Sequence, residues 1–200
     1  MDGDIQNLIN QLHVKNDDIR GPALASLIRL GAKAIPALRA AANDPDPAMR
    51  AKVMEALATI ADPACADLFR HALDDTDGHV RAWGAQGLVR IKDPGAVEAL
   101  LRTFHDYPDE LHGQHTLSSY TLIGMGSKVL PEVIPLLADD NVYTRERAYW
   151  VVMGIVTRMP GYENGWEELA ERLGGYDPHG ALEERESAVS KWVKWAEQFE

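Results

Sequence analysis

A helical hairpin that recurs about every 30 residues constrains this chain more than any other feature. Its clearest copy spans residues 46–75, where Asp46-Pro47 and Asp62-Pro63 are typical helix starts, because Asp caps a helix and Pro is tolerated in the first turn. Such a hairpin has two apolar faces and cannot bury both alone, so it predicts further copies on either side. Apolar residues recur at helical spacing in both of its halves, at Met49, Val53, Leu57 and Ile60 and then at Ala66, Phe69 and Leu73.

The copies stay in register along the chain. A basic residue marks the first helix of each copy, a mostly small residue follows three positions later, and an apolar residue follows seven positions later. The markers lie 30, 31, 34, 30 and 40 residues apart, so the last interval requires an inserted loop. A fixed period of this kind predicts a solenoid. The markers are Arg20, Arg50, Arg81, His115, Arg145 and Arg185. The small residues are Ala23, Val53, Gly84, Ser118, Ala148 and Ala188, and the apolar residues are Leu27, Leu57, Leu88, Leu122, Val152 and Trp192.

The second helices repeat as well. Residues 31–44 and 126–139 align without a gap, and each segment begins with a glycine that is a natural helix stop. An Asp four residues before the marker, the small residue, the apolar residue and a second helix that bears a proline together resemble HEAT repeats. The short period resembles the variety named after phycocyanobilin lyases, rather than the longer HEAT units of roughly 40–47 residues.

The resemblance spans about residues 17–195 and implies an all-α fold, a right-handed α-solenoid of about five helical hairpins. We expect a single HEAT-like repeat domain over residues 1–200, with one capping helix at about residues 4–14 and another at about residues 181–199. Trp192 takes the position of the repeated leucine in the last helix, so it is expected to pack on the fifth hairpin.

Charge and composition exclude several classes of function. The formal net charge is −11, and an acidic surface disfavours both nucleic acid and anionic membranes as partners. No apolar run approaches the roughly 18 residues of a membrane span, and residues 1–10 do not resemble a signal peptide. The single cysteine, Cys65, is expected to be a small core residue in a reducing compartment, so a cytoplasmic location is predicted.

No nucleophile elbow, P-loop or dinucleotide fingerprint is present. We therefore predict that the chain is not an enzyme but a non-catalytic scaffold that binds another protein on its concave face, with no catalytic residue, metal or cofactor. The alternative is a lyase or isomerase accessory protein that handles a bilin or another small chromophore, and a third possibility is a stand-alone structural module. Whether His105, His112 and His115 bind a metal is left open, because His115 also occupies a marker position.

The predicted partner surface follows the second helices, which line the concave side of HEAT solenoids. Helical geometry turns one set of their side chains away from the core, and a partner would span Arg70 to Ile134. The competing interpretation is that Asp67–His71 and Glu98–Arg102 are solvated pairs four residues apart on one helix. The candidate partner-binding residues are Arg39, Arg70, His71, Leu101, Arg102, Ile134 and Pro135.

Overall fold

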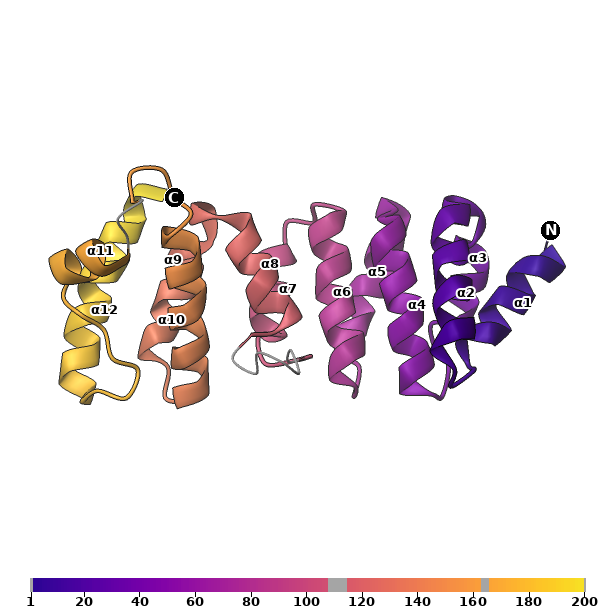
Figure 1. Cartoon of the computed structure of the whole chain (residues 1–200), viewed down its shortest axis with the longest axis horizontal. Helices are drawn as coiled ribbons and strands as arrows, with labels where there is room; N and C mark the ends of the chain where they lie inside the picture. The colour runs from indigo at the N-terminus through magenta and orange to yellow at the C-terminus, as the bar shows by residue number, and fades with distance from the viewer. Residues whose placement is uncertain (1, 108–114, 163–165, 200) are drawn as a thin grey trace. The chain divides into compact units, whose positions relative to one another are not determined.

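The computed structural model describes residues 2–107, 115–162 and 166–199, and most of them lie in helices (Figure 1). None of these described residues forms a β-strand, so the prediction of an all-α fold of helical hairpins is confirmed. The α-helices are α1 (Asp2–Leu12), α2 (Asp17–Leu30), α3 (Ile35–Ala41), α4 (Pro47–Ile60), α5 (Ala66–Ala72), α6 (Gly78–Arg90), α7 (Ala96–Arg102), α8 (Leu117–Met125), α9 (Leu130–Val133), α10 (Val142–Val156), α11 (Trp166–Leu173) and α12 (Leu182–Ala196). The 3₁₀ helices are η1 (Gly31–Lys33), η2 (Pro63–Cys65), η3 (Ser127–Val129), η4 (Ile134–Ala138) and η5 (Glu197–Phe199).

The helices form two compact units, Met1–Asp106 and Tyr107–Glu200. In the first unit, α1 packs against the hairpin of α2 and α3, and the first helices α2, α4 and α6 pack side by side (Figure 1). The second unit contains α8 to α12, and within it α10 packs against α8, α9 and η4. The expectation of one domain over residues 1–200 with two capping helices stays a prediction.

A side-chain cap begins several first helices in the same way. The side-chain oxygens of Asn16, Asp46, Asp77 and Asn141 each accept a hydrogen bond from the backbone N–H two residues later, over 2.9 to 3.0 Å. This bond satisfies one of the donors that a helix start leaves unpaired. The repeated Asp and Asn residues of the sequence therefore set where these helices start.

The repeated apolar position forms the core of both units. Each of its six residues is at most 2% exposed, and each residue at the small position is also buried. The glycines on α6 have a further consequence, because a Cβ at Gly84 would lie 2.8 Å from the Cβ of Ala72, and one at Gly87 would lie 2.4 Å from Cδ1 of Phe69. These distances are shorter than any carbon contact, so α5 and α6 approach each other closely only because both residues are glycine.

The second helix of the fourth hairpin departs from α-helical geometry. Pro131 and Pro135 each lack a backbone N–H, and the segment changes from α9 to the 3₁₀ helix η4 between them. A 3₁₀ helix has about 3.0 residues per turn, so Ile134 and Leu137 fall on the same face. Both are buried, and η4 packs against α10 and α12. The prediction that Ile134 is an exposed residue of a partner surface is therefore wrong.

The last helix closes the second unit through aromatic packing. Trp192 on α12 is fully buried and stacks on Trp166 of α11, with ring centroids 5.0 Å apart. Its indole N–H donates to the carbonyl of Gly174 over 3.4 Å.

Among the described residues, no single helix is both long and apolar enough to cross a membrane. The helix α8 and the segment Ser127–Ala138, bent by 116° at their junction, together have the length and composition.

Candidate functional site

The marker arginines of the second and third hairpins are structural clamps. Nε and Nη2 of Arg50 donate to the carboxylate of Asp75, both over 2.7 Å, while its Nη1 donates to the carbonyls of Asp44 and Pro45. Arg81 repeats this arrangement one copy later with Asp106 as its acid. Each arginine therefore connects the loop before its own helix to an aspartate 25 residues further along. These bonds occupy all three nitrogens of the guanidinium group.

Electrostatics within the clamp follow from these bonds. The hydrogen bond from Arg50 is the largest cause that lowers the pKa of Asp75 below its ordinary value of 3.8, and burial opposes it. The same bond raises the pKa of Arg50, while burial lowers it. In the fifth hairpin, Arg145 keeps the two carbonyl contacts, but its Nε donates to the carbonyl of Pro178 over 2.8 Å. A backbone oxygen of the inserted loop thus replaces the aspartate.

A second set of arginines lies on the second helices of the first unit. Arg39 pairs with Asp67, Arg70 with Asp93, and Arg102 with Asp74. All three ion pairs connect different hairpins, so the pairs within one helix that the competing interpretation named, Asp67–His71 and Glu98–Arg102, are not the ones that form. The reason is geometric, because side-by-side hairpins bring the long arginine side chains to acids of the neighbouring copy.

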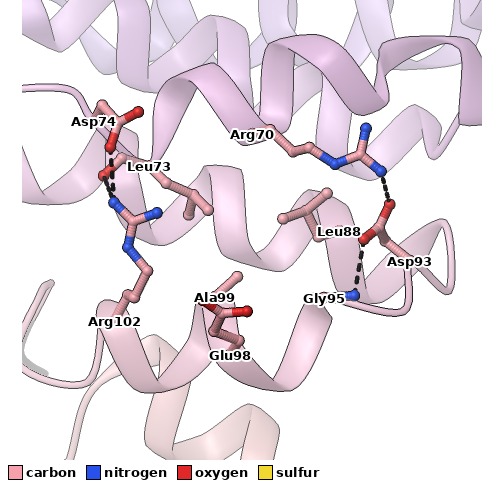
Figure 2. Close-up of a pocket in the computed structure, with 9 residues that line it drawn as sticks. All are labelled: Arg70, Leu73, Asp74, Leu88, Asp93, Gly95, Glu98, Ala99 and Arg102. Carbon is pink, nitrogen blue, oxygen red and sulfur yellow. Dashed lines mark hydrogen bonds and ion pairs between the residues drawn. The ribbon is translucent and has the colours of Figure 1, made fainter.

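Two of these arginines line a cavity of about 330 Å³ between α5 and α7. Figure 2 shows Arg70 and Arg102 on opposite sides of it, each beside its aspartate, with leucine side chains between them. The apolar part of the lining consists of Leu73, Leu88 and Ala99, all three of which are buried. The complete lining is Arg70, Leu73, Asp74, Leu88, Asp93, Gly95, Glu98, Ala99 and Arg102.

The polar lining is balanced rather than basic, since two guanidinium groups face three carboxylates. Asp93 accepts from Arg70 through one oxygen and from the backbone N–H of Gly95 through the other, over 2.9 Å (Figure 2). Asp74 accepts from Nη2 of Arg102 over 2.7 Å. Glu98 is exposed, and no cation within the described part of the chain forms an ion pair with it. The cavity therefore has two paired cations and one free acid around an apolar floor.

The other predicted partner-binding residues lie outside this cavity. Arg39 is bonded to Asp67 and to the carbonyl of Ala64, while His71 is exposed on α5 and Leu101 is half-buried on α7. Pro135 is exposed, but it lies in the second unit.

Sequence reasoning identified Arg70 and Arg102, but it missed the role of Asp74 and Asp93. The available signal was the Asp93-Pro94-Gly95 helix start, which fixes one aspartate at the beginning of α7.

The histidines do not assemble a metal site within the described residues. His105 is exposed and its ring meets Phe104 edge-on, whereas the ring of His115 stacks on Tyr120 with centroids 4.7 Å apart. His112 lies outside the described residues. In the described ranges, no group of three or more His, Cys, Asp or Glu side chains is placed to hold a metal ion.

Comparison with known proteins decides the family. A family model of HEAT repeats matches residues 5–88 and 35–119, which together span more than half of the chain. The chain belongs to the HEAT-repeat family. The cavity between α5 and α7 lies inside the second matched segment, and so do both arginines that line it.

One curated relative and one solved structure add to this. The chain is 38% identical over 85 residues to the bilin biosynthesis protein RpcF of Synechococcus sp. (strain WH8020). That match covers 42% of this chain and 41% of the relative, so the chain spans less than half of the relative's length. The crystal structure of an engineered protein is similar over 98% of this chain and 97% of that one, with 17% identity and a TM-score of 0.44.

The relative also corrects one prediction. The expectation that the chain is not an enzyme is overturned, because the protein that it matches at 38% identity is named for a role in biosynthesis.

Proposed function

We propose that this HEAT-repeat protein handles a bilin, as a lyase, an isomerase or an accessory protein of such an enzyme. The observation that carries the proposal is the 38% identity to a bilin biosynthesis protein over 85 residues. The sequence suggests this function as the alternative to a scaffold without catalytic function, and the relative favours it over that scaffold.

The cavity between α5 and α7 supports the proposal by its chemistry. A bilin is an open-chain tetrapyrrole with a flat conjugated body, two propionate groups and pyrrole N–H donors. An apolar floor suits the body, arginines suit carboxylates, and the free carboxylate of Glu98 suits an N–H donor. The volume of about 330 Å³ lies near the lower end of the roughly 300–1,000 Å³ of small-molecule sites, so the cavity would enclose only part of a bilin.

The test is a titration of the purified 200-residue chain into biliverdin, followed by visible absorbance. We expect a saturable change of the bilin spectrum, because a bilin held in an apolar site changes its conformation and solvation. Biliverdin in buffer without protein and biliverdin mixed with the chain unfolded in denaturant serve as controls. A spectrum that does not change at any protein concentration, together with no retention of biliverdin by the protein on gel filtration, would contradict the proposal.

A further inference from the structure

We propose that Arg70 and Arg102 each bind one of two acidic groups of the same ligand, across the apolar floor of the cavity between α5 and α7. Because this assignment rests on the proposed function, the two acidic groups are the propionates of a bilin. The inference concerns how the cavity selects its ligand, and it makes Arg70 and Arg102 residues that determine specificity.

The first argument is the bonding capacity that the two arginines retain. Arg70 and Arg102 contact their aspartates through Nη2 alone, and the only further contact of Arg102 is a 3.5 Å bond from the same nitrogen to the carbonyl of Leu73. A guanidinium group carries five N–H donors and can bind a carboxylate through two of them. Nε and Nη1 of both arginines therefore remain available to a ligand, as far as the described part of the chain extends.

Three other arginines of the first unit, Arg39, Arg50 and Arg81, form a contrast. Arg39 uses two nitrogens on Asp67 and the carbonyl of Ala64, and Arg50 and Arg81 use all three nitrogens. Arg20 and Arg29 also bond through a single nitrogen, but neither lines the cavity, so Arg70 and Arg102 are distinguished by free donors together with their place in its lining.

The second argument is the exposure of the existing ion pairs. The side chains of Arg70 and Arg102 are 58% and 48% exposed, and exposed ion pairs are weak because water screens them. The Arg50 side chain, by comparison, is 15% exposed. A ligand carboxylate can therefore join Arg70 through its free donors while Asp93, which is 9% exposed, stays in place, and it can join or replace the exposed Asp74 at Arg102.

The third argument is the separation of the two arginines. Arg70 contacts Asp93 just before α7, while Arg102 is the last residue of that helix. A helix rises about 1.5 Å per residue, so these two ends of α7 lie roughly 10 Å apart. Leu73 and Leu88 lie between them in Figure 2, and Glu98 lies below the two leucines, next to Ala99. A ligand that satisfies all of these groups has two separated acids on an apolar body with N–H donors between them, which a single small anion does not provide.

The experiment compares biliverdin with biliverdin dimethyl ester, which keeps the tetrapyrrole body but has neither carboxylate. We expect the unaltered 200-residue chain to bind the diacid much more tightly than the diester. Arg70→Gln and Arg102→Gln should each weaken diacid binding by about tenfold, since each removes a charge-assisted contact, and the double variant should bind both compounds equally. Arg39→Gln is the matched control, because it removes a neighbouring arginine that does not line the cavity, and it should retain the preference.

The outcomes separate this inference from the function on which it rests. Equal binding of diacid and diester by the unaltered chain would overturn the inference while leaving bilin handling in place. The same loss of preference in Arg39→Gln would also overturn it, because the effect would then follow net charge rather than the cavity. Binding of neither compound would overturn the proposed function and the inference together. Circular dichroism of each variant establishes that it is folded, and the half-exposed positions of Arg70 and Arg102 make unfolding unexpected.

Discussion

Four arginines of the first unit differ in how completely the fold uses their guanidinium groups. Arg50 and Arg81 occupy a repeated marker position and bond to an aspartate and to two carbonyls each. Arg70 and Arg102 lie on second helices and keep free donors. Arginine therefore serves the fold at Arg50 and Arg81 and keeps donors for a ligand at Arg70 and Arg102.

The Asp75 clamp gives a prediction on pH. The carboxylate has a lowered pKa in the folded chain, so its contribution to stability is complete above the ordinary value of 3.8 and is lost as the pH falls through the folded value. We expect Asp75→Asn, whose amide oxygen can still accept from the backbone N–H of Asp77, to lower the free energy of unfolding by about 2 kcal/mol at neutral pH, as for hydrogen bonds to charged groups. The difference from the unaltered chain should shrink as the pH falls below 3.8 and vanish once the pH is below the lowered pKa of the folded chain.

Denaturant unfolding at a series of pH values measures this difference. Asp67→Asn is the control, because Asp67 also pairs with an arginine but its side chain is 65% exposed, and it should have a much smaller effect. A difference for Asp75→Asn that stays constant from neutral to acidic pH would show that its cause is not the ionised carboxylate.

At the scale of elements, the contact between α5 and α6 depends on two missing side chains. We expect Gly87→Ala to destabilise the first unit by about 1–3 kcal/mol, because its methyl group would overlap the ring of Phe69 and force the helices apart. Gly21→Ala is the control on α2, since nothing lies within 4 Å of the added Cβ, and alanine there should be neutral or stabilising. Thermal denaturation compares the two, and equal melting temperatures for both variants would refute the close approach.

Elements also mark the limit of what the sequence predicts. The period located the hairpins and the repeated core position, because burial at a fixed register follows from helical geometry alone. The period did not predict that Ile134 is buried, since Pro131 and Pro135 change the local helix from α to 3₁₀ and so rotate the buried face. The period also did not predict which acid pairs with each arginine, because a partner on the neighbouring hairpin, such as Asp74 for Arg102, has no fixed spacing in the sequence.

At the scale of the whole molecule, the cavity depends on three neighbouring elements rather than on a motif. Its lining comes from the end of α5, from Leu88 on α6 and from α7 with the loop before it. The sequence predicted two of its residues, Arg70 and Arg102, as part of an extended surface for a protein partner. The two arginines line one cavity because neighbouring hairpins pack side by side, and the sequence alone does not show this arrangement.

The two compact units lead to a prediction about unfolding. Each unit has a core of its own, and four of the five tryptophans, Trp150, Trp166, Trp192 and Trp195, lie in the second. Trp192 is fully buried and stacked, so Trp192→Ala should destabilise the second unit by about 3–5 kcal/mol. For a unit of about 100 residues this corresponds to a fall in melting temperature of more than about 12 °C. We expect tryptophan fluorescence to report this early transition, while circular dichroism retains a second transition at the original temperature from the first unit. Gly87→Ala should produce the reverse pattern, and a single transition that moves as a whole with either variant would mean that the units unfold together.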